Sequence, residues 1–123
     1  MTVALSALGQ IALPVSDADG ADAFYAEKLG LPRLFRFGDL VFFDCGGVRL
    51  MLEGNSTEAR QTEGVCLYYR VEAIDGAYEE LKTRGVPFDD APHLIARMPD
   101  QELWMAFFRD PDRNLLALME ERR

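Results

Sequence analysis

The feature that most constrains the fold of this chain is a sequence pattern that occurs twice. Asp19-Gly20-Ala21 returns as Asp75-Gly76-Ala77. Further matches follow in the same order: Gly30-Leu31-Pro32 with Gly85-Val86-Pro87, Phe42-Phe43 with Phe107-Phe108, and Leu50-Met51-Leu52-Glu53 with Leu116-Ala117-Leu118-Met119. Each match is weak alone, but several in one order indicate a duplicated structural unit.

Both halves repeat one order of predicted elements, which is a strand, a helix and three more strands. Alternating apolar runs predict the opening strands at Gln10 to Ser16 and Cys66 to Glu72. In the first helix Asp17 is placed to cap the N-terminus, and the second helix is predicted to end at Gly85. The remaining predicted strands are Arg33 to Phe37, Leu40 to Cys45, Val48 to Glu53, His93 to Met98, Glu102 to Arg109 and Leu115 to Glu120.

This order predicts an α+β protein made of two βαβββ modules. The first covers residues 1–53, a polar linker covers 54–63, and the second module covers 64–123. A chain of 123 residues suits one compact domain, so we expect both modules to share one domain.

Strand alternation predicts which side chains share the sheet face that points away from each helix. That face is mixed in character, as expected for a ligand pocket. Its predicted ligand-binding residues are Gln10, Arg49, Met51, Cys66, Tyr68, Arg70, Ala117 and Met119. In the aromatic strand around Trp104, both alternating sets are apolar, so the pattern leaves open which set faces the pocket. Asp89-Asp90 and the segment from Glu120 to Arg123 are interpreted as solvated surface.

Charge and cysteine content exclude several classes of protein. A net charge of -8 argues against nucleic-acid binding, which needs a cationic face, and disfavours anionic membrane surfaces. Two cysteines are too few for a disulfide scaffold. The longest uncharged stretch, Met1 to Ser16, is too short to span a bilayer and lacks the basic start of a signal peptide. We therefore expect a cytoplasmic protein with reduced thiols.

The two βαβββ halves, the segment FYAEKLGLP and the segment FFRDPDRNLLAL together resemble the vicinal oxygen chelate superfamily. This superfamily includes glyoxalase I, extradiol dioxygenases, methylmalonyl-CoA epimerase and the fosfomycin and bleomycin resistance proteins. The resemblance covers nearly the whole chain and implies mixed, curved sheets that enclose one cavity. It also implies a homodimer. Arg113 stands where this family usually has a glycine.

The resemblance does not extend to the family's metal site. The positions that match its metal ligands hold Gln10, Met51, Cys66 and Ala117. One amide and one thiol do not form a site for the hard ions or for zinc and iron. The sequence therefore predicts no metal and no cofactor.

Two residues are candidates for a catalytic role. His93, the single histidine, is a candidate general base or a ligand of a displaced metal site with Asp44, Asp100 or Glu102. A structural or surface role for it is the simpler interpretation. Cys66 has Arg70 on its face, which would favour a thiolate, but a small buried side chain is again the simpler interpretation.

The leading hypothesis is a glyoxalase/bleomycin-resistance-like protein that binds a small, partly apolar molecule without the usual metal, as a resistance or sequestration protein or as a metal-independent isomerase or lyase. One alternative is a divalent-metal lyase, epimerase or dioxygenase with a relocated site, and another is a structural dimer module. Whether any reaction is catalysed stays open.

Arg49 and Arg70 both point to an anionic ligand, unless acids such as Glu53 pair with them. Trp104, the single tryptophan, is a candidate fluorescence reporter of binding.

Overall fold

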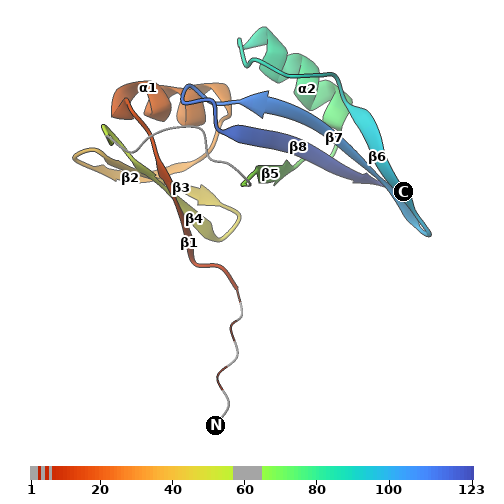
Figure 1. The fold of residues 1–123 in the computed structure, drawn as a ribbon, viewed down its shortest axis with the longest axis horizontal. Helices are drawn as coiled ribbons and strands as arrows, with labels where there is room; N and C mark the ends of the chain where they lie inside the picture. The colour runs from red at the N-terminus through yellow and green to blue at the C-terminus, as the bar shows by residue number, and fades with distance from the viewer. Residues whose placement is uncertain (1–2, 4, 6, 57–64) are drawn as a thin grey trace. The chain divides into compact units, whose positions relative to one another are not determined.

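The computed structural model describes residues 3, 5, 7–56 and 65–123. The chain divides into two compact units, Met1–Ala59 and Arg60–Arg123. Each unit is a βαβββ module with one four-stranded mixed sheet, so the fold predicted from the repeat is confirmed (Figure 1). The predicted linker at 54–63 lies mostly outside the described residues.

The first unit begins with a strand that pairs in parallel with its last one. Its elements are β1 (Gln10–Pro14), α1 (Ala18–Ala23), the π-helical turn η1 (Phe24–Lys28), β2 (Arg33–Phe37), β3 (Leu40–Cys45) and β4 (Val48–Glu53). The strand order is β1-β4-β3-β2, which makes β1 and β2 the edges of the sheet. The β1–β4 pair is parallel, whereas β4–β3 and β3–β2 are antiparallel hairpin pairs.

The core of the first unit lies between this sheet and the helical segment. Tyr25, Phe43, Leu50 and Leu52 are fully buried there. Alternation along β4 explains the division, because Leu50 and Leu52 face the helix while Met51 faces the opposite side. The helix-facing side of the sheet is also tied to α1 by Asp22, whose carboxylate lies 2.7 Å from the guanidinium of Arg33.

Asp17 does not cap α1, contrary to the sequence-based prediction. It occupies the N-cap position, but its side chain makes no capping hydrogen bond. The amide of Ala18 instead donates to Oδ1 of Asn55, at 3.2 Å. Asn55 lies two residues after the end of β4, so the helix start is capped by a side chain that follows the last strand of the unit.

Gly54 makes that approach possible. A Cβ at this position would lie 2.5 Å from the carbonyl oxygen of Asp39 and 2.9 Å from Cα of Ala18, and closer still to Cβ of Ala18. Only glycine brings the end of β4 this close to the start of α1.

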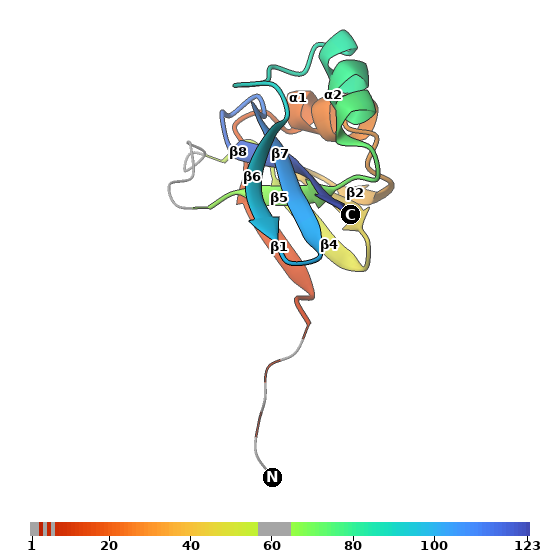
Figure 2. The same ribbon diagram turned by 90° about the vertical axis from the view of Figure 1, so that its right-hand side faces the viewer.

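The second unit has the same topology. Its elements are β5 (Leu67–Arg70), α2 (Ile74–Thr83), β6 (His93–Met98), β7 (Gln101–Arg109) and β8 (Leu115–Arg122). The strand order is β5-β8-β7-β6, with β5 parallel to β8 (Figure 2). As predicted, α2 ends before Gly85, which has a φ of 89°. The amides of Gly85 and Val86 donate to the carbonyls of Lys82 and Leu81, which is the Schellman pattern.

Ring contacts show which face of β7 meets the helix. Phe108 is fully buried and lies 5.2 Å from the ring of Phe88, which lies 4.8 Å from the ring of Tyr78 on α2. Phe108 and the buried Ala106 therefore face α2, and Met105 and Phe107 face away. The sequence pattern left this question open.

The turn between β7 and β8 is closed by two buried polar side chains. The Asp110 carboxylate accepts hydrogen bonds from the backbone amide of Asn114, at 2.8 Å, and from its Nδ2, at 2.9 Å. Arg113, between them, has a φ of 67°. It is thus a non-glycine residue in the left-handed region, at the position where the family usually has glycine.

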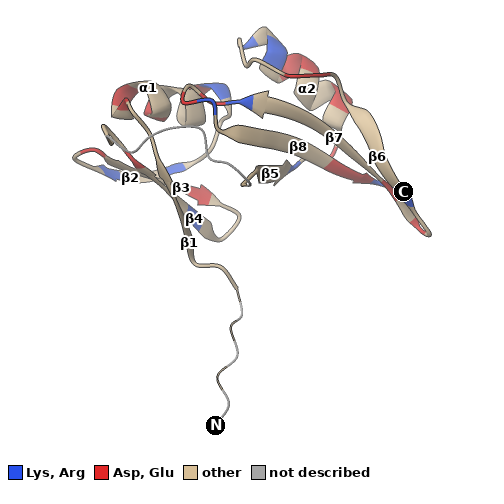
Figure 3. Ribbon diagram, viewed as in Figure 1, with Lys and Arg blue, Asp and Glu red and all other residues tan. Residues whose placement is uncertain are grey.

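The prediction of a solvated segment from Glu120 to Arg123 is wrong for Glu120, because β8 continues through Arg122. Glu120 is buried, and its Oε1 accepts the amide hydrogen of Ile74 at 2.8 Å, which caps the start of α2. The Arg122 guanidinium is the main cause that lowers the pKa of Glu120, and the hydrogen bond from Ile74 adds to it. In Figure 3 the middle of β7 and β8 is free of charged residues, and the acidic residues of β8 gather at its end.

The repeated Asp-Gly-Ala motif has the same structural role in both units. Asp19 pairs with Arg36 of β2 at 2.8 Å, and Asp75 pairs with Arg122 of β8 at 3.4 Å. In each case the first turn of the helix is held to an arginine of the sheet. In both units the repeated motif therefore marks a helix start that forms an ion pair with the sheet.

Candidate ligand-binding site

Three predicted ligand-binding residues meet on the open face of the first unit, the sheet face that points away from α1. The Nε of Arg49 donates to Oε1 of Gln10 at 2.8 Å. The Nε2 of Gln10 lies 3.9 Å from the sulfur of Met51. The register explains the grouping, because β1 and β4 run in parallel with Gln10 opposite Arg49.

An aromatic pair completes this open face, and sequence reasoning missed it. The Arg49 guanidinium carbon lies 5.4 Å from the centre of the Phe42 ring, within the range of a cation–π contact. Phe42 stacks on Phe35 of the edge strand β2, with ring centroids 4.5 Å apart. Alternation along Arg33 to Phe37 indicated that Phe35 lies in a strand. It could not show which side chains Phe35 stacks on, because a bulge shifts the register between Arg33 and Phe35.

The charge of Arg49 is not balanced by an acid among the described residues of its own unit. It contacts the neutral amide of Gln10 and the ring of Phe42. Asp44 lies opposite Arg49 in the register, but no carboxylate of the described part of the first unit forms an ion pair with it. An exposed cation with an oriented guanidinium is suited to bind an anion.

The open face of the second unit, which points away from α2, has two rows of side chains. One row joins Tyr68, Ala117 and Phe107 across β5, β8 and β7. The next joins Arg70, Met119, Met105 and His93 across all four strands. The Tyr68 and Phe107 rings are 6.4 Å apart in an edge-to-face arrangement. The predicted residues on this face thus share one surface, to which Phe107, Met105 and His93 are added.

Arg70 differs from Arg49 because it has an acidic partner. Its guanidinium lies 3.1 Å from the carboxylate of Glu121 on the neighbouring strand β8. The sequence had left open that acids pair with these arginines, and Arg70 does have such an acidic partner.

Cys66 is in an environment that favours the neutral thiol. Desolvation raises its pKa, and this outweighs the opposing effects of the Tyr68 hydroxyl and the Arg109 charge. The same contact raises the pKa of Tyr68, because a nearby thiolate disfavours a phenolate. A nucleophilic role for Cys66 is not supported by this geometry.

Asp100 and Glu102 are the acids of its own unit that were considered as partners of His93 in a displaced metal site. Among the described residues, neither contacts His93. Glu102 belongs to the helix-facing set of β7, where it accepts a hydrogen bond from Trp104 Nε1 at 3.0 Å and pairs with Arg97. The Nδ1 of His93 instead lies 3.0 Å from the carbonyl oxygen of Ala91 and 3.6 Å from the Asp90 carboxylate.

The donor set at the family's metal positions does not fit a divalent ion. Gln10 and Met51 contact one another in the first unit, and Arg49 already uses the Gln10 amide oxygen. In the second unit Ala117 is fully buried and offers no donor. Within the described ranges, no three His, Cys, Asp or Glu side chains gather closely enough to hold a metal. No step of a reaction can therefore be assigned to a metal at these positions.

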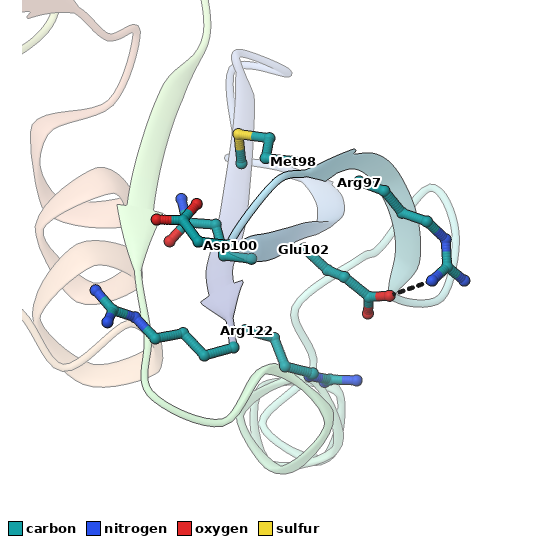
Figure 4. A pocket seen from close by; sticks show the side chains of 7 residues that line it. Arg97, Met98, Asp100, Glu102 and Arg122 are labelled. Carbon is teal, nitrogen blue, oxygen red and sulfur yellow. Dashed lines mark ion pairs between the residues drawn. The ribbon is translucent and has the colours of Figure 1, made fainter.

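A hollow of about 380 Å³ lies at the end of the second unit, where the β6–β7 hairpin meets the end of β8 (Figure 4). It is lined by Arg97, Met98, Asp100, Gln101, Glu102, Arg122 and Arg123. Two arginines at its wall already have acidic partners, since Arg97 contacts Glu102 at 2.7 Å and Arg122 contacts Glu120 at 3.0 Å. This hollow was not predicted. Of its lining residues, only Asp100 and Glu102 had been considered from the sequence, as partners of His93 in a displaced metal site.

Residues 7–118 match the family model of the Glyoxalase/Bleomycin resistance protein/Dioxygenase superfamily. The chain belongs to this superfamily. Among curated proteins, the superfamily member is similar to the uncharacterized protein YraH of Bacillus subtilis (strain 168), with 31% identity over 89% of this chain and 94% of YraH.

Solved structures of superfamily proteins share the fold of this chain. A glyoxalase/bleomycin resistance protein/dioxygenase from Alicyclobacillus acidocaldarius superposes with a TM-score of 0.76, at 26% identity over 94% of this chain and 91% of that one. A lactoylglutathione lyase from Agrobacterium tumefaciens shares the fold, with a TM-score of 0.71 at 24% identity over 94% of both chains. Among the described residues of this superfamily member, no helix has the length and apolar character needed to cross a membrane.

Proposed function

We propose that this superfamily member binds a small organic anion with a planar, apolar body, without the divalent metal of the family's enzymes. The observation that carries the proposal is the Arg49 guanidinium, which is oriented by Gln10, lies over Phe42 and has no acidic partner in the described part of its unit. A carboxylate, phosphate or sulfonate would bind this fork, and each charge-assisted hydrogen bond contributes about 1.5–3 kcal/mol.

The surrounding side chains support an aromatic or otherwise flat body. Phe35 and Phe42 form a stacked pair beside the guanidinium, and Met51 supplies an adaptable apolar contact. The open face of the second unit, with Cys66, Tyr68, Ala117 and Met119, offers a largely apolar surface of its own. Binding and sequestration then require no reacting group.

Arg70 has a secondary role in this proposal. Because Glu121 lies 3.1 Å away, an anion would have to compete with this carboxylate for Arg70. The open face of the second unit is therefore the weaker candidate for anion binding. Removing Arg70 should reduce anion binding less than removing Arg49, and removing the charge of Glu121 should free Arg70 to bind an anion.

The test uses two fluorescent probes that differ in charge. 8-Anilinonaphthalene-1-sulfonate is an anion with a flat naphthalene ring, and N-phenyl-1-naphthylamine is its neutral counterpart. Arg49→Gln should weaken binding of the sulfonate by about tenfold or more and leave the neutral probe nearly unchanged. Arg70→Ala should cost several-fold at most, and Glu121→Gln should tighten the sulfonate.

Equal losses of both probes in Arg49→Gln, or no loss of either, would refute an anion site at Arg49. Arg97→Gln is the matched control, because Arg97 lies outside the proposed site and pairs with Glu102. Trp104 does not serve as the reporter, since it shares the helix-facing side of β7 and lies 4.6 Å from the Arg122 guanidinium.

A further inference from the structure

Three side chains that can bind a metal, two of them soft thioethers, lie next to each other on the open face of the second unit. His93 of β6 is paired with Met105 of β7, and Met105 is paired with Met119 of β8. Directly opposed residues of neighbouring strands share a face, with Cβ atoms about 4.5–5.5 Å apart. One imidazole and two thioethers therefore follow one another across three strands, and all three side chains are partly buried.

The ring of His93 is held in the tautomer that leaves Nε2 free to bind. Its Nδ1 lies 3.0 Å from the carbonyl oxygen of Ala91, which can only accept a hydrogen bond, so Nδ1 carries the proton. In the neutral ring Nε2 then has an unshared electron pair, and no hydrogen bond to Nε2 is found among the described residues. Metal-binding histidines are oriented by the same kind of backbone contact at the second ring nitrogen.

The surroundings of His93 suit a cation of low charge. The Asp90 carboxylate lies 3.6 Å from Nδ1 and supplies one negative charge nearby. The Phe107 ring lies 6.3 Å from the His93 ring, and Tyr68 lies on the far side of Phe107. This apolar wall reduces competition from water for weak thioether ligands.

We propose that His93, Met105 and Met119 form a binding site for a soft monovalent cation, with Cu(I) as its biological form. Thioether and imidazole ligands select Cu(I), whereas Mg²⁺, Mn²⁺ and Ca²⁺ require oxygen ligands that this row lacks. The site does not use the four positions of the family's divalent metal, and it does not rest on the proposed organic-anion function. Only Met119 is common to both proposals.

The test uses Ag(I), an air-stable probe for thioether and imidazole ligands. Because Cys45 and Cys66 are free thiols that would bind Ag(I) themselves, both are replaced by serine, and the amide NMR spectrum checks that the fold is retained. Silver nitrate is titrated in chloride-free buffer onto protein labelled with ¹³C at the methionine methyls and ¹⁵N in the histidine ring. The Met105 and Met119 methyls and Nε2 of His93 should shift together and saturate at one equivalent.

Substitutions then assign the ligands. Met105→Leu, Met119→Leu and His93→Gln should each weaken Ag(I) by about tenfold or more. Met98→Leu is the matched control and should change nothing, because Met98 pairs with Gln101 at the other end of β6.

Two results would overturn the proposal. One is a shift of all methionine methyls in parallel without saturation, which would indicate non-specific binding. The other is an unchanged His93 Nε2 resonance at saturation. His93 is partly exposed at the start of an edge strand, so His93→Gln should fold and decides the question even if a methionine variant is unstable. If His93→Gln loses Ag(I) binding and still binds the anionic probe, the cation site is independent of the proposed anion-binding function.

Discussion

Single residues decide where the chain can approach itself closely. Gly54 and Arg113 occupy comparable places, each in a connection next to the last strand of its unit. Gly54 is required by the space around it, because backbone and side-chain atoms lie where a Cβ would be. Arg113, in contrast, has a Cβ and still adopts a left-handed backbone conformation, which costs free energy.

We predict that Gly54→Ala destabilises the first unit by about 2–3 kcal/mol, as expected for overpacking against backbone atoms. Gly76→Ala is the control, because a Cβ there meets nothing within 4 Å and Gly76 lies inside α2. That change should stabilise the protein by about 0.5–1 kcal/mol. Urea unfolding of both variants measures the difference, and similar effects of the two would contradict the assigned role of Gly54.

Arg113→Gly should stabilise the protein by about 0.5–1 kcal/mol, since glycine adopts a φ of 67° without the cost that a Cβ imposes. Arg113→Ala separates the backbone from the side chain, because alanine keeps the Cβ and should leave stability nearly unchanged. Thermal unfolding of the two variants provides the comparison. A gain in both would assign the effect to the lost arginine side chain instead.

At the scale of elements, both helices are capped from a distance. The first amide of α1 donates to Asn55 after β4, and that of α2 donates to Glu120 within β8. Each helix start is therefore completed only when the last strand of its unit is in place. The two caps differ chemically, because the Asn55 amide does not titrate and the Glu120 carboxylate does.

The Glu120 cap makes stability depend on pH. Its pKa is lowered in the folded state, so its contribution is fully present above the ordinary value of 4.5 and is lost as the pH falls through the lower folded-state pKa. Glu120→Gln keeps an acceptor for Ile74 but removes the charge next to Arg122. We expect this variant to be less stable than the parent by about 1 kcal/mol at pH 7.

Because glutamine does not titrate, the difference in unfolding free energy between parent and variant should shrink as the pH falls below 4.5. Urea unfolding of both proteins from pH 7 to pH 3 measures it. A difference that stays constant over this range would contradict a charge-based role for Glu120.

Local patterns predicted most elements, and long-range contacts account for what they missed. Arg33–Phe37 and His93–Met98 were predicted to the residue because alternation and flanking turns are local signals. The capping by Asn55 and Glu120 joins residues 37 and 46 positions apart, and local sequence gives no sign of it. Likewise, the facing of Phe108 is decided by Phe88, a residue outside β7. The grouping of Gln10, Arg49 and Met51 was predictable because register follows from alternation, whereas the stacking of Phe35 depends on a bulge.

For the whole molecule, the edge strands give a reason to expect self-association. Phe37 on β2 is 76% exposed and Ile95 on β6 is 44% exposed. Apolar edge strands tend to pair with or be covered by another chain. We therefore predict a homodimer at micromolar concentration, measured by light scattering. Phe37→Lys should shift the mass toward the monomer, and an unchanged dimer would show that β2 is not part of the interface.

The parallel pairing of first and last strands also sets how each unit resists a pulling force. A load applied at the start of β1 and the end of β4 acts along both strands in opposite directions. Their hydrogen bonds are then sheared together and are not opened one after another. The same holds for β5 and β8, but the register joins five residue pairs in the first unit and four in the second. Under tension the second unit should therefore rupture at the lower force, although both units have the same topology.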